Sequence, residues 1–415
     1  MPIFNKTIFT GFAPNLTGRD TLTALAYLCF PWKWLSWRQG GYAGRAEKKI
    51  KNYFGVSQAK IFDSGRSALF FALKALSAEQ GTEVLVQAYT CVVVANAITQ
   101  TGATPVYLDV GDDFNLDPEK LESKITARSK ILIIQHTFGQ PARLDKLLAI
   151  AKKHNLKIIE DCAHSLGARY QGKLLGTFGH LGMLSFGSDK IISCARGGAL
   201  ITGDETIGQQ INNFQENLPP SSRLKIFQHL MHYPAFYLGK ALYSLKIGKI
   251  ILKLAKNLNI INKIIYPEEK AGERGKNYPA RLPDCLAKIL VNQLADLEKT
   301  IIHQKKIAAL YDNLIDNKNI YQPFKAQTDC VYLRYPILTN EPKSLVRLAK
   351  QQAIILGDWY STPIAPGDIN LGGTSYKPGD CPKAEALARQ SVNLPTDRQI
   401  SQADAERIIK FINSF

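Results

Sequence analysis

The chain has 415 residues, of which 45% are apolar, so it is long enough for about two globular domains with a large core. Its net charge of +17 implies an anionic partner, such as a phosphorylated substrate, a membrane surface or a nucleic acid. The seven cysteines are scattered and form no Cys-x-x-Cys pair, which argues against a disulfide framework and against a metal site. With no signal-peptide pattern and no apolar run of roughly 18 to 20 residues, the sequence predicts a cytoplasmic protein without a membrane-spanning helix.

Residues 56 to about 205 alternate apolar strand patterns with helical ones. The segment 142–154, for example, places Leu144, Leu147, Leu148 and Ala151 on one helical face. Strands are predicted at residues 83–88, 104–109, 130–135, 157–161, 182–186 and 198–202. This alternation predicts an α/β fold with a mostly parallel sheet covered by helices, whose ligands bind at the carboxyl ends of the strands.

The pattern changes after residue 205. A basic, apolar stretch runs over residues 223–266, where Pro234, Gly239 and Gly248 predict a division into short helices. A long helix is predicted from Pro283 onward, followed by a compact αβ segment. We therefore predict an N-terminal segment (1–55) that packs on the main body, a large ligand-binding domain (56–280) with an insertion at about 220–270, and a small C-terminal domain (281–415).

Two residues at predicted strand ends indicate the chemistry. Asp161 ends the apolar run 157–161, and Lys190 follows the strand predicted at 182–186. A lysine that forms a Schiff base and a carboxylate that keeps a pyridine nitrogen protonated are parts that a pyridoxal 5′-phosphate (PLP) enzyme needs. Two plainer alternatives stay open: Asp161 could cap the next helix, and Lys190 could be a surface lysine.

Candidate phosphate ligands lie nearby. Gly65 permits a tight turn that opens a helix, where the backbone amides of Arg66 and Ser67 would face an anion. Ser185, shortly before Lys190, could donate a hydrogen bond to the same phosphate. A capped helix start and a strand-edge hydroxyl are the alternatives, and His164 could either contact the cofactor or be a packed histidine.

The chain resembles the DegT–StrS family of fold-type-I PLP-dependent nucleotide-sugar aminotransferases from about residue 12 to its end. The order and spacing from Asp161 to Lys190 are the specific part of this resemblance. The motifs that carry it are Gly65-Arg66-Ser67-Ala68-Leu69, Val86-Gln87-Ala88-Tyr89-Thr90 with Ala95-Asn96-Ala97, His136-Thr137-Phe138-Gly139-Gln140-Pro141, Glu160-Asp161-Cys162-Ala163-His164-Ser165-Leu166-Gly167, Ser185-Phe186 with Lys190, and Asn393-Leu394-Pro395.

The resemblance implies a fold-type-I PLP-binding large domain, a smaller C-terminal α/β domain and a role for each candidate residue. Lys190 would bind the cofactor covalently and move the proton at the substrate carbon. Asp161 would pair with the pyridine nitrogen, and His164 would lie close to the ring. The phosphate would be held by Gly65, Arg66, Ser67 and Ser185.

Other positions matched to the family define the rest of the expected site. Arg281 matches a position that reaches into the neighbouring subunit's site, which implies a homodimer with shared active sites. Cys91 stands where the family usually stacks an aromatic residue over the PLP ring, with Tyr89 nearby but out of register. Arg196 stands where the family usually has an acidic residue. The retained Lys190 argues against the family's dehydratase branch, in which a histidine replaces it.

The insertion and an aromatic N-terminal segment combine apolar and basic side chains. Trp32, Trp34 and Trp37 lie close to Lys33 and Arg38, a mixture that suits peripheral contact with the inner face of a membrane. The alternative that we favour at this point is that the apolar side chains pack on their own domain and the lysines are solvated. Nucleic-acid binding is not expected, because no recognition motif accompanies the charge.

The sequence therefore predicts a PLP-dependent aminotransferase that transfers an amino group from glutamate to a keto-sugar, which the resemblance implies is nucleotide-linked, in glycan or cell-envelope biosynthesis. The alternatives are a PLP enzyme for a non-sugar or lipid-linked ketone and a non-catalytic regulatory protein with the same fold. Neither the sugar, the nucleotide, the aminated carbon nor the stereochemistry can be read from the residues.

Overall fold

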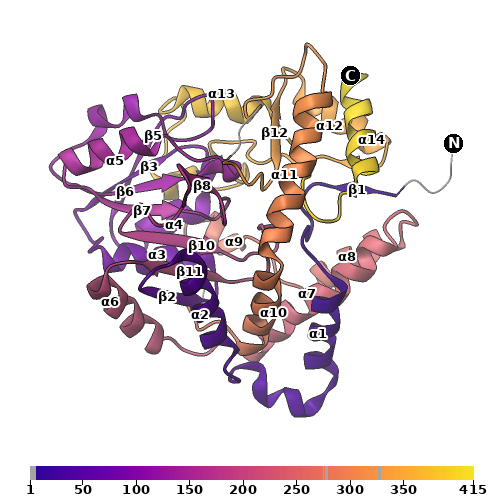
Figure 1. The fold of residues 1–415 in the computed structure, drawn as a ribbon, viewed down its shortest axis with the longest axis horizontal. Helices are drawn as coiled ribbons and strands as arrows, with labels where there is room; N and C mark the ends of the chain where they lie inside the picture. The colour runs from indigo at the N-terminus through magenta and orange to yellow at the C-terminus, as the bar shows by residue number, and fades with distance from the viewer. Residues whose placement is uncertain (1–5, 274, 276–278, 326–328) are drawn as a thin grey trace.

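The computed structural model describes residues 6–273, 275, 279–325 and 329–415, and a seven-stranded sheet forms its centre (Figure 1). Neighbouring strands are parallel except at β11, which is antiparallel to β2 and β10. The order is β2 (Gln58–Phe62), β11 (Gly198–Thr202), β10 (Leu181–Ser185), β7 (Lys157–Asp161), β6 (Ser129–Gln135), β3 (Glu83–Gln87) and β5 (Thr104–Leu108). The six predicted strands and the mostly parallel α/β sheet are confirmed, and β2 adds an edge strand that was not predicted.

Both faces of the sheet are buried, which explains why its strands read as continuous apolar runs. On β6, Ile131 and Ile133 belong to one apolar cluster, and Leu132 and Ile134 belong to the other. The first cluster includes α3 (Gly65–Ala75), α4 (Val92–Thr99) and α6 (Glu205–Glu216); the second includes α2 (Tyr42–Phe54), α5 (Leu144–Lys153) and α10 (Asp284–Ala295). The helix predicted over 142–154 is therefore confirmed as α5.

The single long helix predicted from Pro283 onward is in fact two helices. α10 ends at Ala295, and α11 (Leu297–Leu314) begins after Asp296. The backbone of Asp296 leaves the helical region, with φ −105° and ψ 7°. Because both helices bury an apolar face, the apolar spacing continues across the break and does not reveal it.

The insertion forms a helical hairpin of α7 (Arg223–Ala241) and α8 (Ile247–Asn257), followed by the short α9 (Pro267–Lys270). α7 continues through Pro234 and Gly239, so the prediction that they divide the segment was wrong. Gly239 instead permits close helix packing, because a Cβ there would lie 2.5 Å from Cγ of Leu252 on α8. α7 also packs along α1 (Gly18–Cys29), and these helices lie together on one side of the molecule (Figure 1).

The C-terminal part is built around an antiparallel pair, β12 (Tyr335–Leu338) with β15 (Ser391–Leu394). Its helices are α12 (Pro342–Gln351), α13 (Pro382–Gln390) and α14 (Gln402–Asn413). Two parallel pairs join it to earlier segments: β1 (Ile8–Phe9) with β13 (Ile354–Ile355), and β4 (Thr90–Cys91) with β14 (Ile364–Ala365). The domain divisions at residues 55 and 280 stay predictions.

The remaining short elements lie in connections between the main ones. They are the hairpin β8 (Arg169–Tyr170) and β9 (Lys173–Leu174) and the 3₁₀ turns η1 (Pro31–Lys33), η2 (Leu35–Trp37), η3 (Pro118–Lys120), η4 (Glu122–Lys124), η5 (Thr137–Gly139) and η6 (Leu371–Thr374). Within the described ranges, no helix combines the length and the apolar character needed to cross a bilayer.

Candidate active site

The predicted chemical residues gather at the carboxyl ends of two adjacent strands. Asp161 is the last residue of β7 and pairs in register with Met183 on the parallel strand β10. Ser185 ends β10, and Lys190 lies five residues later, after a turn in which its amide donates to the carbonyl of Gly187 at 3.2 Å. The sheet therefore places Asp161, Ser185 and Lys190 at one edge, as predicted from the strand ends.

Asp161 is a buried carboxylate with one oxygen engaged. Its Oδ1 accepts the backbone amide of Ala163 at 2.9 Å, and no described residue donates to its Oδ2. Burial raises the pKa of Asp161, and the nearby charge of Lys190 opposes that rise. The side chain is thus prepared to accept one further hydrogen bond from a cationic group.

Lys190 carries an amine whose proton is weakly held. Burial lowers the pKa of Lys190 from 10.5 to about 8, although the charges of Asp161, Cys91 and Asp189 act in the opposite direction. No described residue accepts a hydrogen bond from its Nζ. A lysine with this pKa supplies a neutral, nucleophilic amine near neutral pH.

An aromatic group next to Lys190 was missed by sequence reasoning. The ring centroid of Trp359 lies 5.2 Å from Nζ of Lys190. The same indole stacks on His164, with 5.6 Å between centroids and 17° between planes. Trp359 stands far from the other site residues in sequence, in the irregular segment before β14, and no motif marked it.

His164 is packed, and both of its ring nitrogens have partners. Nδ1 accepts the backbone amide of Phe138 at 3.4 Å, so the proton is assigned to Nε2, which lies 3.3 Å from Oη of Tyr360. Burial holds the pKa of His164 well below its usual value, which keeps the ring neutral. These contacts match the packed alternative, and a contact between His164 and the cofactor ring stays a prediction.

The start of α3 forms a narrow cradle beside Ser185. Ser64 caps the helix, because its Oγ accepts the amide of Ser67 at 3.3 Å. A Cβ on Gly65 would lie 2.9 Å from Oγ of Ser185, and a Cβ on Gly198 would lie 2.5 Å from the backbone nitrogen of Gly65. Glycine at both positions lets the backbone amides of the helix start and the Ser185 hydroxyl share one small space.

The side chain of Arg66 points to the insertion. Its guanidinium pairs with the buried carboxylate of Glu269 in α9, and its Nη2 donates to the carbonyl of Ile264 at 2.9 Å. Arg196 lies close by, with Cζ 5.4 Å from the ring centroid of Tyr266. The role predicted for Arg66 therefore rests on its backbone amide in the first turn of α3, and the contact with Glu269 was not predicted.

Cys91 lies near the reactive amine, whereas Tyr89 does not face it. Cys91 pairs with Ala365 across β4 and β14, and the charge of Lys190 acts on the pKa of its thiol, which burial raises. Tyr89 is fully buried, and its Oη accepts the amide of Tyr360 at 3.0 Å. The aromatic ring beside Lys190 is thus Trp359, and which residue stacks on the cofactor stays a prediction.

Arg281 is exposed and lies close to the start of α3. Its guanidinium donates to the carbonyl of Glu216. The preceding carbonyl, that of Ala280, accepts the amide of Asp63 at 3.2 Å, two residues before Gly65. The reach of Arg281 into a neighbouring subunit stays a prediction.

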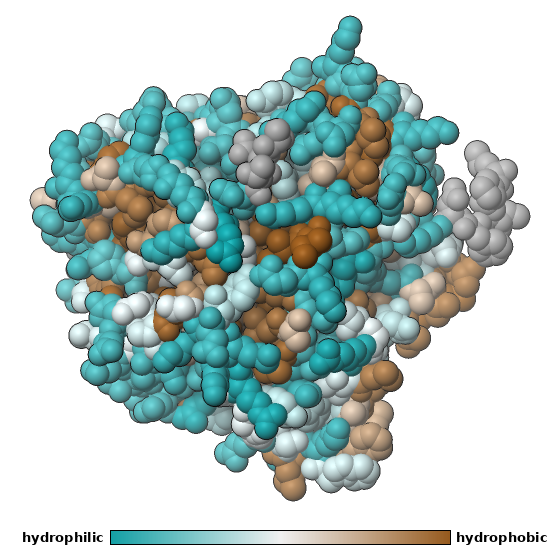
Figure 2. Space-filling view, viewed as in Figure 1, coloured by the Kyte–Doolittle hydropathy of each residue, from teal (hydrophilic) through white to brown (hydrophobic). Residues whose placement is uncertain are grey.

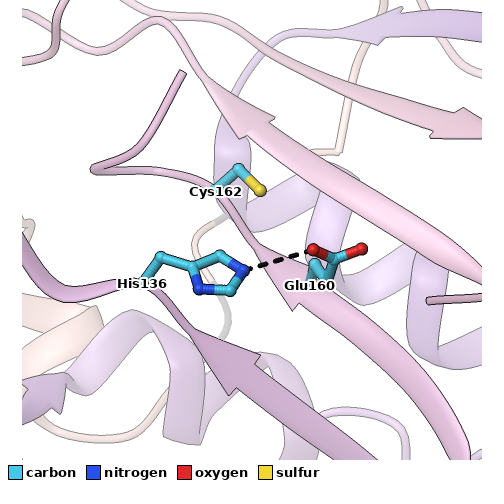
Figure 3. A group of neighbouring side chains, drawn as sticks. All are labelled: His136, Glu160 and Cys162. Carbon is cyan, nitrogen blue, oxygen red and sulfur yellow. Dashed lines mark hydrogen bonds and ion pairs between the residues drawn. The ribbon is translucent and has the colours of Figure 1, made fainter. Parts of the chain in front are cut away.

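One buried group in the described chain has the residue types of a metal site (Figure 3). His136 Nδ1 accepts the amide of Ala142 at 3.1 Å, so its Nε2–H donates to Glu160 at 3.2 Å. Cys162 keeps a protonated thiol, because burial and Glu160 raise its pKa well above the usual value. The Glu160 oxygens also accept three backbone amides, from Gly176, Phe178 and Gly179. We therefore interpret this group as a structural clamp, because its histidine and carboxylate atoms already have partners.

The edge formed by Asp161, Ser185 and Lys190 fits PLP in its donor set. The available Oδ2 of Asp161 suits a protonated pyridine nitrogen, and the weakly basic Lys190 suits an aldehyde. The glycine cradle at the start of α3 suits a phosphate, since helix-start amides and a hydroxyl bind such an anion.

Comparisons with known proteins identify the family of the chain. A model of the DegT/DnrJ/EryC1/StrS aminotransferase family matches residues 32–413. The GDP-perosamine synthase of Escherichia coli O157:H7 is 27% identical over 407 residues, which cover 97% of each chain. The structure of S. venezuelae DesV is 26% identical, with a TM-score of 0.72 and coverage of 95% of this chain and 94% of that one. A putative sugar aminotransferase from Streptococcus pneumoniae in its PLP-form, 19% identical, has a TM-score of 0.76 over 99% of this chain and 98% of that one.

Proposed function

Because the chain belongs to the DegT/DnrJ/EryC1/StrS aminotransferase family, whose enzymes depend on PLP, we propose that it transfers an amino group from glutamate to a nucleotide-linked keto-sugar. The observation that carries the proposal is the lysine–carboxylate pair Lys190 and Asp161 beside the cradle at Gly65 and Ser185. The names of relatives, such as GDP-perosamine synthase, support a sugar substrate. The net charge of +17 suits a diphosphate-bearing substrate.

Each residue has a task in this proposal. PLP, when bound, supplies an aldehyde for amines and a ring that accepts electrons from the substrate carbon. Asp161 would pair with the ring nitrogen, and the α3 start together with Ser185 would hold the phosphate. The low pKa of Lys190 makes its Nζ available as a neutral amine that would hold the cofactor, and the same Nζ would take and return the proton at the substrate carbon.

The visible absorption spectrum of the purified protein tests this function. We expect a yellow band in the wild type that glutamate bleaches, and no such band in Lys190→Ala. Keto-sugars on different nucleotides are then added to the bleached protein, and mass spectrometry identifies the one that restores the band and gains nitrogen. A wild type that takes up no PLP, or whose band glutamate leaves unchanged, contradicts the proposal.

We further propose that the protein acts as a homodimer whose active sites are shared. The supporting observation is that Arg281 is exposed and lies close to the start of α3. The carbonyl of the preceding residue, Ala280, accepts the amide of Asp63, two residues before α3 begins. Mixing inactive Lys190→Ala with Arg281→Ala tests it, because a mixed dimer with shared sites regains one complete site. Mixed dimers without any recovered activity contradict sharing.

A third proposal concerns the surface of the insertion. α8 buries Leu252 and Ala255, yet apolar side chains on its other face are exposed. Their exposed fractions are 49% for Ile247, 57% for Ile250, 52% for Leu254 and 66% for Leu258. The expectation that the apolar side chains of the insertion pack on their own domain therefore holds for Leu252 and Ala255 and fails for this exposed face. Figure 2 shows apolar side chains along the edge where Figure 1 places α1 and α8.

Charge accompanies this apolar face. Exposed lysines alternate with it along α8, and Trp32, Trp34 and Leu35 are exposed beside α1. Residues 223–266 contain no acidic residue, and the lysines on α8 and directly before it are Lys246, Lys249, Lys253 and Lys256. An apolar stripe flanked by lysines suits the surface of an anionic bilayer, so we propose peripheral binding at the cytoplasmic membrane face.

Vesicle co-sedimentation tests the membrane proposal. We expect binding to vesicles with anionic lipid, weaker binding at high salt, and loss of binding in Ile250→Ser/Leu254→Ser. The matched control is Leu314→Ser, which changes an exposed leucine at the end of α11. Equal recovery of wild type with anionic and neutral vesicles, or dimerisation through this face, contradicts it. The cytoplasmic location itself stays a prediction from the cysteine pattern.

A further inference from the structure

Arg334 is a buried arginine without an ionic partner in the described chain. It directly precedes β12 and is 5% exposed. No described carboxylate lies within ion-pair distance of its guanidinium, and no described group hydrogen-bonds to it. A buried charge without a partner is costly, and an anionic ligand group opposite this guanidinium would offset that cost.

The surrounding backbone leaves room for this guanidinium. A Cβ on Gly11 would lie 2.7 Å from Nη2 of Arg334, and a Cβ on Gly357 would lie 3.0 Å from Nη1. The flat face of the guanidinium lies against Trp359, with 3.5 Å between Cζ and the ring centroid. The arginine is therefore held in one place with its nitrogen atoms still unpaired.

Trp359 connects Arg334 with the reactive amine. Nζ of Lys190 lies 5.2 Å from the centroid on which Arg334 stacks. Cζ and Nζ are thus separated by at most the sum of the two distances to that centroid, about 9 Å, a span that one small substrate can bridge. Burial is the main cause of the lowered pKa of Lys190 and of His164, and the charge of Arg334 acts in the same direction on both, so Arg334 lies within electrostatic range of the two groups.

Nearby acids do not remove the need for an anion. Asp189, Asp358 and Asp397 act on Arg334 electrostatically, yet none is within ion-pair distance. Burial raises the pKa of Asp397 to about 6, and Lys240 already faces it. Asp358 is exposed. The guanidinium can therefore accept a further carboxylate without displacing a bound one.

We propose that Arg334 binds a carboxylate of the amino donor while the donor reacts at Lys190. The proposal rests on the function proposed above and names the recognition of one of its substrates. A planar guanidinium binds a carboxylate through two parallel hydrogen bonds. The amino donor carries its carboxylates close to the reacting nitrogen. A nucleotide-linked keto-sugar presents hydroxyl groups around its carbonyl and carries its phosphates at another ring position.

Separate measurement of the two half-reactions tests this assignment. In PLP-loaded protein, we expect Arg334→Gln to raise the glutamate concentration for half-maximal bleaching by about 30-fold or more, with a small effect on the maximal rate. Arg334→Lys keeps the charge and should lose less. The return half-reaction with the keto-sugar should change by less than about threefold. Arg347→Gln, which changes an exposed arginine on α12, is the matched control.

A binding measurement gives a second readout that needs no turnover. Glutarate, an unreactive dicarboxylate, should bind the wild type in calorimetry and bind Arg334→Gln at least tenfold more weakly. Comparison of glutamate with alanine as amino donor identifies which carboxylate binds. If Arg334→Gln weakens the reaction of both donors, Arg334 binds the α-carboxylate; if it weakens only the reaction of glutamate, Arg334 binds the side-chain carboxylate. Equal glutarate binding by wild type and both Arg334 variants overturns the proposal. So does a defect confined to the keto-sugar half-reaction, which would assign Arg334 to a phosphate. If glutarate binding depends on Arg334 but glutamate bleaches nothing, the carboxylate site stands and the proposed function fails.

Discussion

Replacement of Lys190 by an apolar side chain of similar length should stabilise the cofactor-free protein below pH 8. Burial lowers the pKa of Lys190 from 10.5 to about 8. A lysine whose pKa is lower in the folded chain than in the unfolded chain reduces the free energy of unfolding at any pH at which it is protonated in both. This loss is complete below pH 8 and disappears as the pH rises from 8 to 10.5. A pKa of about 8 in place of 10.5 corresponds to a cost of about 3 kcal/mol at low pH.

Urea denaturation of cofactor-free wild type and Lys190→Met measures this difference. We expect Lys190→Met to be more stable by about 3 kcal/mol near pH 7, with the gain largely gone at about pH 10. The double variant Asp161→Asn/Lys190→Met removes the extra cost of leaving the Asp161 carboxylate without its cation. Lys343→Met on α12, which changes an exposed lysine, is the control.

The result that refutes this reasoning is a gain that does not depend on pH, or no gain in either the single or the double variant. A confirmed gain would show what the reactive amine costs the fold. Near pH 7, about a tenth of the Lys190 amines are neutral, which is about 300-fold more than for a lysine with a pKa of 10.5.

Two further predictions concern the cradle and the buried clamp. Gly198→Ala places a Cβ 2.5 Å from the backbone nitrogen of Gly65, so we expect PLP to bind at least about tenfold more weakly, as measured by spectroscopic titration. The control is Gly203→Ala, whose Cβ would have no atom within 4 Å and which should leave PLP affinity unchanged. Glu160→Gln leaves the donors at Gly176, Phe178, Gly179 and His136 short of acceptors, so we expect urea denaturation to show a loss of about 3 to 5 kcal/mol. A loss below about 1 kcal/mol would contradict the clamp.

The sequence predicted those parts of the fold and site that follow from local pattern. The six predicted strands are continuous apolar runs, and parallel strands bring their carboxyl ends to one edge, which is why Asp161, Ser185 and Lys190 could be placed together. Strand β2 was missed, because Gln58 and Lys60 are only half-buried at the sheet edge and weaken its apolar pattern.

The parts that could not be predicted depend on contacts between distant segments. Trp359 and Arg334 reach Lys190 only through the packing of the C-terminal part on the sheet. The pairing of Arg66 with Glu269 depends on where the insertion folds back. α7 packs on α1 and α8 and continues through Pro234, against the local preference of proline.

The short parallel pair of β4 and β14 has a consequence for movement of the C-terminal part. Thr90 and Cys91 in the large domain share backbone hydrogen bonds with the chain around Ile364, and the amide of Thr90 donates to the carbonyl of Pro363 at 2.8 Å. A swing of the C-terminal part away from the sheet would break this seam next to the reactive amine. The seam therefore resists movement of the C-terminal part relative to the sheet, because such movement would have to break these hydrogen bonds first.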